Sequence, residues 1–429
     1  LSRLRTKPSY FNIKQKIRRF FSRFRRGDSI NDFISRVKAG LKRFLFPTSF
    51  FEDMGINYYG PVDGHDIGEI RHMLRAAKHS GKPCIVHCIT KKGKGYKYSE
   101  ENPERFHGSS GFNIDSGEYK VSSASPSYSD AFGSQLVRMA REDRRICAVT
   151  AGMTLGVGLK QFASLFPKRF FDVGIAEDHG VTMSAGLAKQ GMKPVCAIYS
   201  TFLQRAYDQL IHDVAIEGLH VVFCLDRAGI VPGDGKTHQG LFDVPFLRTV
   251  PGMKIMCPGS EKELVSSMRL ALDDTGPVAI RYEKCSEGEY KSDCSAEDAT
   301  VIRQGSDAAI VCYGAITNEV LAACRELSDL EIECEVIKLF RLDVGDYDAV
   351  YDSVKKTGVF VCVEESVNEG SMGMRIAAGL ALEGIDVKKT MLINAGAEFL
   401  PCGSINDLRR HLRMDRESIV LRIRELIGK

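Results

Sequence analysis

Short apolar runs alternate with amphipathic stretches along most of this chain. From about residue 129 to 290, runs of strand length are separated by stretches with helical periodicity, and a second alternating block runs from about 299 to 429. Strands separated by helices favour parallel sheets with right-handed crossovers. The expected strands are 146–150, 170–175, 195–199, 221–225, 279–282, 308–313, 334–339, 359–363 and 391–393. The expected helices are 130–142, 178–189, 204–217, 262–273, 318–327, 370–382 and 416–426.

The region before residue 129 holds a smaller set of elements. A short amphipathic helix is expected at 69–77 and a buried strand at 83–90, followed by a loop rich in Gly and Lys at 91–96. Residues 113–128 are polar and rich in Ser, which is typical of a linker. The chain has 429 residues. At roughly 150 residues per domain, this length favours two to three domains.

Composition narrows the class of protein. Hydrophobic residues make up 44% and charged residues 27%, which excludes disorder as the dominant state. We find no apolar run near the roughly 18 residues that a membrane span needs, so no membrane partner is expected. The 13 cysteines are scattered and lack CxxC spacing. Buried reduced thiols, and hence a cytoplasmic location, fit this pattern better than a disulfide framework or a zinc site.

The charge is unevenly distributed. Residues 1–50 hold 14 Lys and Arg against 2 Asp and Glu, whereas the remainder holds 45 against 53. A transit peptide and a nucleic-acid-binding arm are both compatible with such a segment. Its many Phe and Tyr residues favour a mobile basic helical segment that covers another surface, and the start at Leu1 suggests that the true beginning is missing. No recognised motif accompanies the charge, so no nucleic-acid partner is expected.

Polar residues gather where three of the expected strands end. Strand 170–175 leads to Glu177, strand 195–199 ends at Tyr199, and strand 221–225 leads to Asp226-Arg227 and a Gly-rich loop with His238. Ligands of open parallel sheets bind beyond the carboxyl ends of the strands. We therefore expect three neighbouring strand ends to bring a carboxylate, a phenol, a guanidinium and an imidazole to one rim.

Each of these residues also has a plainer interpretation. Glu177 can simply favour the start of a helix through the helix dipole. Asp226 and Arg227 can form a surface ion pair. His238 can be an ordinary loop histidine, and Tyr199 can serve packing alone. Because all four fall on one rim, we favour a functional site there.

The Gly-rich loop of residues 229–240 resembles two phosphate or metal motifs without matching either. Its glycine spacing before Lys236-Thr237 is one residue too long for GxxxxGK[ST], so we do not expect a nucleoside triphosphatase. Gly233-Asp234-Gly235 resembles the GDG motif that binds Mg²⁺ in thiamine-diphosphate enzymes. That motif needs an Asn about 25–30 residues later, and no Asn lies between Asn113 and Asn318.

Several motifs resemble the 1-deoxy-D-xylulose-5-phosphate synthase family of transketolase-like enzymes. They run in family order over essentially the whole chain: LSRLRT (1–6), GPVDGHD (60–66), TKKGKGY (90–96), FHG (106–108), FDVGIAEDH (171–179), YSTFLQRAYDQ (199–209), DRAG (226–229), DGKTHQG (234–240) and EES (364–366). The resemblance implies condensation of pyruvate with glyceraldehyde 3-phosphate, with release of CO₂, using thiamine diphosphate and Mg²⁺. The product feeds isoprenoid, thiamine and pyridoxal synthesis.

The family also implies an α/β fold with three domains. They are three-layer parallel-sheet domains of the transketolase-like, thiamine-diphosphate-binding type, followed by a C-terminal α/β domain. Here they correspond to a remnant of the diphosphate-binding domain at 1–120, a pyrimidine-binding domain at 121–297 and a transketolase-like C-terminal domain at 298–429. A homodimer is expected from the same resemblance.

The resemblance assigns cofactor-binding residues one by one. Glu177 matches the glutamate that binds the aminopyrimidine ring and activates the cofactor. Phe202 matches the aromatic residue that stacks on this ring, and Ile175 would help to hold the bent cofactor. Tyr96 and Lys92 match residues that line the cofactor and its diphosphate.

The remaining assignments concern catalysis and substrate. His107 and His238 match active-site histidines suited to proton transfer or to stabilising an oxyanion. The expected pocket for the acceptor aldehyde and its phosphate consists of Tyr199, Arg205, Arg227, Asp234 and Lys284.

Two departures from the family pattern affect these expectations. Glu283-Lys284 stand where the family has Pro-Arg. Lys284 keeps the positive charge but cannot bind two phosphate oxygens as Arg does, and Glu283 adds a negative charge beside it. We therefore expect weaker binding of the acceptor phosphate. The family's first third, with its GDG aspartate and metal-binding Asn, is not in this sequence, so no metal ligand is expected here. We therefore expect a truncated synthase, or one whose N-terminal part is a separate chain, with little or no activity by itself.

Two alternatives stay open. The chain could be a subunit of a split transketolase or 2-oxoacid dehydrogenase, but such chains begin at the pyrimidine domain. It could also be a fragment that dimerises without catalysis.

Overall fold

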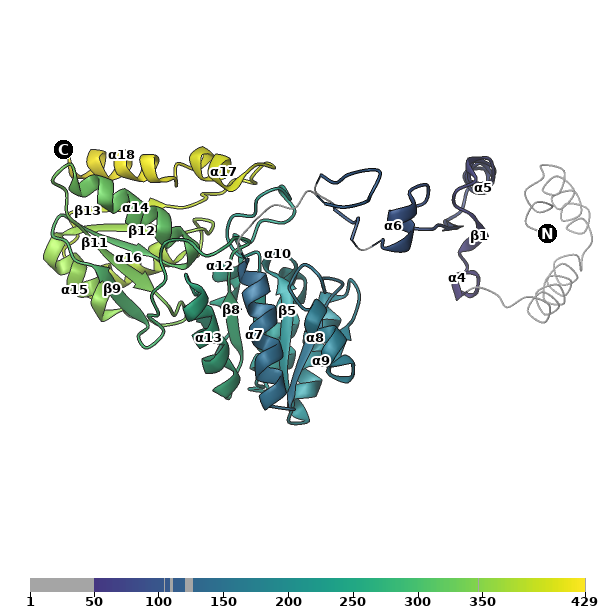
Figure 1. The fold of residues 1–429 in the computed structure, drawn as a ribbon, viewed down its shortest axis with the longest axis horizontal. Helices are drawn as coiled ribbons and strands as arrows, with labels where there is room; N and C mark the ends of the chain where they lie inside the picture. The colour runs from purple at the N-terminus through teal and green to yellow at the C-terminus, as the bar shows by residue number, and fades with distance from the viewer. Residues whose placement is uncertain (1–49, 104, 109–110, 120–125, 346, 429) are drawn as a thin grey trace, which may run out of the picture. The chain divides into compact units, whose positions relative to one another are not determined.

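The computed structural model describes residues 50–103, 105–108, 111–119, 126–345 and 347–428 (Figure 1). The chain divides between Ser122 and Ser123 into two compact units, each with its own secondary structure. The basic segment expected to be helical lies outside the described residues, except for Phe50. Among the described residues, every helix is too short or too polar to cross a membrane.

The first unit is built on one β–α–β element. Strands β1 and β2 pair in parallel, and α5 connects them. Helix α5 begins where the Asp66 side chain accepts a hydrogen bond from the Glu69 amide, and it ends at Gly81, whose φ of +61° suits glycine. The elements are α4 (Phe50–Asp53), β1 (Asn57–Asp63), α5 (Ile67–Ser80), β2 (Cys84–Ile89) and α6 (Lys97–Glu101).

The second unit begins with a six-stranded, fully parallel sheet of order β4-β3-β5-β6-β8-β7. Helix α7 packs with α8 and α13, whereas α9 packs with η3, and both groups contact β3 or β5, which gives three layers. The strands are β3 (Ile146–Thr150), β4 (Phe170–Asp172), β5 (Lys193–Tyr199), β6 (Val222–Asp226), β7 (Lys254–Met256) and β8 (Val278–Arg281). The helices are α7 (Tyr128–Glu142), α8 (Lys160–Leu165), η1 (Pro167–Arg169), α9 (Glu177–Lys189), α10 (Ser200–Leu203), η2 (Gln204–Ala206), α11 (Tyr207–Gln209), η3 (Leu210–Ala215), α12 (Asp243–Leu247) and α13 (Glu261–Asp273).

A five-stranded sheet of order β13-β12-β10-β11-β9 follows in the same unit. Four strands are parallel, and β9 pairs antiparallel with β11 at the edge. The strands are β9 (Ala299–Arg303), β10 (Ala308–Cys312), β11 (Cys334–Leu339), β12 (Val359–Val363) and β13 (Lys389–Ile393). The helices are η4 (Gly314–Ile316), α14 (Thr317–Ser328), α15 (Asp348–Thr357), α16 (Met372–Leu382), α17 (Ile405–His411) and α18 (Arg416–Ile427).

Buried charges join the two sheets of the second unit. Lys338 on β11 places its Nζ atom 2.8 Å from the Glu263 carboxylate on α13, and both side chains are fully buried. Glu263 also accepts a hydrogen bond from the Tyr290 hydroxyl. A charge at this depth is tolerated only when it is paired and hydrogen-bonded, so this contact fixes how the two sheets meet.

The expected α/β class with parallel sheets is confirmed, with some differences in detail. Strand β4 stops at Asp172 rather than 175, because the Asp172 carboxylate accepts hydrogen bonds from the Gly152 and Gly174 amides and turns the chain. The single helix expected at 204–217 is broken into 3₁₀, α and π segments. All thirteen cysteines are free thiols, and eight of them are buried.

Candidate active site

The expected rim exists, with one correction to its order. Strands β5, β6 and β8 are neighbours, but β3 separates β4 from β5, so the three strand ends that we expected to adjoin do not all do so. The register places Tyr199 beside Asp226 and Leu225 beside Arg281. Because the whole sheet is parallel, these strands still end at one edge.

Glu177 is buried at the start of α9. It is the first residue of the helix and only 3% of it is exposed, although the preceding Ala176 offers no side-chain cap. The Arg205 guanidinium donates a hydrogen bond of 2.8 Å to the Glu177 carboxylate. The helix N-terminus and this arginine both stabilise the negative charge. Glu177 therefore favours its helix, as the plainer interpretation holds, and is also part of a buried cluster.

A row of aromatic rings continues from Arg205. The guanidinium carbon of Arg205 lies 5.1 Å from the centre of the Phe202 ring. The Phe202 ring stacks on Tyr199 at 5.9 Å and meets the His238 ring edge-on at 5.2 Å. The guanidinium of Arg227 covers Tyr199 at 3.7 Å. Glu177 is thus linked through Arg205 to the aromatic and cationic residues predicted for the site.

The phenol of Tyr199 is held in a tight position. Burial raises its pKa, with Arg227 opposing the shift, so the hydroxyl keeps its proton. A Cβ atom on Gly156 would lie 1.6 Å from the Tyr199 hydroxyl, so any larger residue at position 156 would force the Tyr199 side chain to move. Gly156 was not predicted as a site residue, and only its place in the Gly-rich stretch 152–158 hinted at it.

Asp226 and Arg227 do form an ion pair, at 3.5 Å, but it is buried rather than at the surface as the plainer interpretation expects. Asp226 is fully buried, and burial raises its pKa to about 6, with Arg227 opposing the shift. The Ser129 hydroxyl donates a 2.5 Å hydrogen bond to the Asp226 carboxylate. The two residues are 97 positions apart, and no sequence pattern predicts this contact. Arg227 adopts a φ of +59°, which turns its side chain back over Tyr199.

Asp234 joins the cations at this edge. Its carboxylate lies 2.7 Å from the Lys284 ammonium and 3.7 Å from the Arg227 Nε atom. Glu283, the expected negative neighbour of Lys284, is only 4% exposed, and its carboxylate accepts a hydrogen bond from the Ala315 amide. Asp234 therefore offsets part of the positive charge of Lys284 and Arg227.

Four further residues were predicted for the site. Lys92, Tyr96 and His107 belong to the first unit, where Lys92 and His107 are exposed and the Tyr96 hydroxyl donates to the Ile114 carbonyl. Ile175 precedes Glu177 by two residues and is 84% exposed. An apolar side chain this exposed beside a polar cluster is suited to covering by a ligand or another surface.

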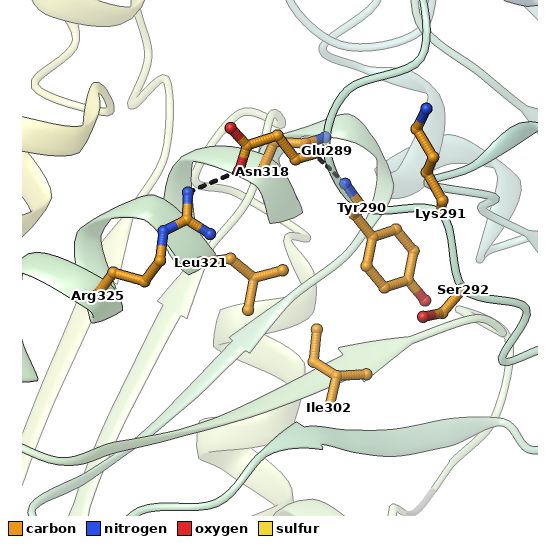
Figure 2. A pocket seen from close by; sticks show the side chains of 8 residues that line it. All are labelled: Glu289, Tyr290, Lys291, Ser292, Ile302, Asn318, Leu321 and Arg325. Atoms are coloured by element: carbon orange, nitrogen blue, oxygen red, sulfur yellow. Dashed lines mark hydrogen bonds and ion pairs between the residues drawn. The ribbon is translucent and has the colours of Figure 1, made fainter.

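Possible metal ligands and one cavity among the described residues bear on where a ligand could bind. Among the residues that the structure describes, no group of three or more His, Cys, Asp and Glu side chains is placed to hold a metal ion. A cavity of about 300 Å³ lies where α14 meets the segment before β9 (Figure 2). Its one prominent charged contact is the 2.7 Å ion pair of Arg325 and Glu289, which is already neutral. We therefore assign it no role in the site.

Comparisons with known protein families match three successive parts of the chain. Residues 1–90 match "1-deoxy-D-xylulose-5-phosphate synthase", residues 124–287 match "Transketolase, pyrimidine binding domain", and residues 297–419 match "Transketolase, C-terminal domain". The rim described above lies mostly within the second match.

Individual relatives and solved structures agree with these matches. The 1-deoxy-D-xylulose-5-phosphate synthase of Clostridium acetobutylicum is 41% identical over 99% of this chain and 69% of the relative, and that of Heliobacterium modesticaldum is 40% identical over 99% and 67%. A solved "Split gene transketolase, inactive beta4 tetramer" has a TM-score of 0.62 at 25% identity, covering 70% of this chain and 98% of that one. A transketolase from Leishmania mexicana, at 18% identity and a TM-score of 0.60 over 72% of this chain and 46% of that one, shares the fold. The chain belongs to the 1-deoxy-D-xylulose-5-phosphate synthase family of transketolase-like proteins.

Proposed function

We propose that this chain forms the pyrimidine-binding and acceptor-binding parts of a 1-deoxy-D-xylulose-5-phosphate synthase. The reaction is the thiamine-diphosphate-dependent condensation of pyruvate with glyceraldehyde 3-phosphate, which gives 1-deoxy-D-xylulose 5-phosphate and CO₂. The observation that carries this proposal is the buried carboxylate of Glu177, joined through Arg205 to the rings of Phe202 and His238. The domains proposed for these roles are 1–120, 121–297 and 298–429.

The residues present fit the pyrimidine half of thiamine diphosphate. A buried carboxylate suits a ring N–H donor, and the Phe202 ring offers a stacking face. The buried Ser200 hydroxyl oxygen, two residues before Phe202 in the sequence, has no hydrogen-bond partner in the described structure, as expected where a ligand supplies one. When bound, thiamine diphosphate supplies the carbon nucleophile of the reaction. Glu177 would orient the ring and hold a proton, and Ile175 would exclude water.

The cationic edge fits an anionic acceptor. Arg227 and Lys284 present positive charge, and Asp234 between them can accept hydrogen bonds from hydroxyl groups. The protonated Tyr199 phenol is a further donor. In the proposed enzyme, His238 moves a proton near the acceptor carbonyl. Lys92, Tyr96 and His107 would act from the diphosphate-binding domain.

We further propose that residues 1–429 alone have little or no synthase activity. This chain spans 69% of its Clostridium acetobutylicum relative, and a metal-bound diphosphate would need Mg²⁺ ligands from the remaining part. We propose that this chain is a truncated synthase or one that receives this part from a separate chain, and that it assembles as a homodimer.

The test measures pyruvate- and aldehyde-dependent CO₂ release with thiamine diphosphate and Mg²⁺. The chain alone is compared with a chimaera that adds the missing N-terminal part of the Clostridium acetobutylicum relative, each with a Glu177→Gln control. We expect activity only in the chimaera, with loss in the control. Robust turnover by the chain alone would contradict the proposed inactivity, and activity that ignores Glu177→Gln would contradict the proposed site.

A split-transketolase subunit is the second candidate, because the solved split-gene transketolase is covered over 98% of its length. Residues 1–90, which match the 1-deoxy-D-xylulose-5-phosphate synthase family, favour the first candidate. An assay with ketose donors in place of pyruvate discriminates between the two.

A further inference from the structure

The loop that carries Asp234 and His238 is held from outside by the C-terminal half of the second unit. This loop, residues 227–241, leaves β6 and returns to α12. Gly229, Gly233 and Gly235 all have positive φ, so the loop has little intrinsic stiffness. Its geometry therefore depends on the contacts that it makes.

Within the loop, two contacts close its base and brace its middle. Gly229 and Gly240 exchange backbone hydrogen bonds of 2.8 and 2.9 Å. The buried Gln239 amide accepts from the Val231 amide and donates to the Val231 carbonyl. These bonds shape the loop but do not tie it to the rest of the molecule.

Glu365 supplies the principal tie. One of its carboxylate oxygens accepts a 3.0 Å hydrogen bond from the Ile230 amide. The other oxygen accepts two from the Arg409 guanidinium, at 2.8 and 3.0 Å. Glu365 is only 2% exposed, so these partners stabilise a charge that would otherwise be buried alone. A carboxylate that accepts a backbone N–H forms a stronger bond than a neutral acceptor does.

The fit between the loop and Glu365 is close. A Cβ atom at Gly229 would lie 2.4 Å from the Glu365 carboxylate, so the loop backbone rests directly on this side chain. Neutral contacts flank it: the Val367 amide and the Ser366 hydroxyl donate to the Leu241 carbonyl, the Gly233 amide donates to the Gly403 carbonyl, and the Cys402 thiol donates to the Gly233 carbonyl. From the C-terminal half, Glu365 is the charged group among these contacts, whereas the ion pair of Lys284 with Asp234 holds the loop from the end of β8.

We propose that Glu365, oriented by Arg409, is a positioning residue that sets where the loop presents Asp234 and His238 to the rim. The inference rests on the proposed function for the meaning of the rim, but not for the contact itself. Glu365 does not touch the rim residues. It acts through the backbone at Ile230, and a small displacement there moves both side chains away from Lys284 and Phe202.

The test uses the full chain and no catalytic assay. Amide hydrogen exchange of residues 229–241 is measured in the wild type, Glu365→Gln and Glu365→Ala. Loss of a charge-assisted hydrogen bond should speed exchange of the loop about tenfold or more, most in the alanine variant. Glu335→Gln is the matched control, because Glu335 is equally buried in β11 and bonds only to groups remote from the loop, among them Ser353 and Lys356.

A second readout reports the position of His238 itself. Its ring lies edge-on to Phe202, so its proton resonances in a selectively labelled sample carry a ring-current shift. We expect this shift to shrink in Glu365→Gln and to be unchanged in Glu335→Gln. Arg409→Lys keeps the charge but loses one of the two hydrogen bonds to Glu365, so its loop exchange and its His238 shift should lie between those of the wild type and Glu365→Gln. This variant replaces the Glu365 variants if they fail to fold.

Unchanged loop exchange and an unchanged His238 resonance in folded Glu365 or Arg409 variants would overturn the proposal. Neither readout depends on turnover, so a failed synthase assay leaves this proposal standing, and its own failure leaves the proposed reaction untouched.

Discussion

Replacing Glu283 by Gln should change how the stability of the protein depends on pH. Glu283 follows β8 and is 4% exposed; its Oε1 atom accepts a hydrogen bond from the Ala315 amide. Its Oε2 atom is buried without a hydrogen-bond partner in the described structure. Burial raises the pKa of this carboxyl to about 7, with Arg281 opposing the shift and Glu365 adding to it.

The size of the effect follows from the shift in pKa. The carboxyl titrates at 4.5 in its ordinary environment and at about 7 in the folded protein. A folded pKa above the unfolded one means that the stability is fully present below pH 4.5 and is lost as pH rises through 7. A shift of this size corresponds to about 3 kcal/mol in the free energy of unfolding. Gln cannot ionise, and its carbonyl can still accept the Ala315 hydrogen bond, so the variant avoids this loss.

Urea unfolding of the wild type and Glu283→Gln at several pH values between 4.5 and 8 measures this directly. The difference between the two proteins should move in favour of the variant by about 3 kcal/mol across this range. Glu335→Gln is a control in which the pKa shift of the replaced carboxyl has the opposite sign. Although burial opposes it, hydrogen bonds from Lys356 and Ser353 lower the Glu335 pKa, so this variant should lose stability instead. A Glu283→Gln difference that is the same at pH 4.5 and pH 8 would refute the reasoning.

Three further changes have distinct expected outcomes. Gly156→Ala should lower the melting temperature through about 1–3 kcal/mol of overpacking against Tyr199, and an unchanged melting temperature would contradict the close approach. Phe132→Ala empties a fully buried ring position and should lower the free energy of unfolding by about 3–5 kcal/mol, whereas Phe50→Ala, at 72% exposure, should change it by less than about 0.5 kcal/mol. Lys284→Arg should tighten binding of inorganic phosphate several-fold in calorimetry, because a guanidinium can bind two phosphate oxygens; equal affinity would remove Lys284 from the proposed phosphate pocket.

The central strands were predictable because burial on both faces makes them continuous apolar runs. Strands 146–150, 334–339 and 359–363 match the structure residue for residue. Strand β9 was missed because it is a half-buried edge strand with alternating polar residues, and β1 because Gly60 and Pro61 interrupt its pattern. Both errors arise where tertiary pairing rather than local sequence makes the strand.

The rim was predictable from the rule that ligands bind beyond strand ends, but its partners were not. Arg205 lies in a 3₁₀ segment of the region 204–217, where one regular helix was expected, and its guanidinium reaches Glu177, 28 positions earlier in the sequence. The Glu283 carboxylate packs against Gly314 and accepts a hydrogen bond from the Ala315 amide, 32 positions away in the sequence. Contacts of this kind depend on packing between distant segments, which periodicity does not encode.

The buried pair of Lys338 and Glu263 limits how this protein can be re-engineered. Separating the two sheets, or exchanging one half for a piece without the matching charged residue, would leave Lys338 or Glu263 buried without its partner. This would lower the free energy of unfolding by about 3–5 kcal/mol. Chimaeras should therefore carry both halves across together, or swap the ammonium and the carboxylate for apolar side chains in the same step.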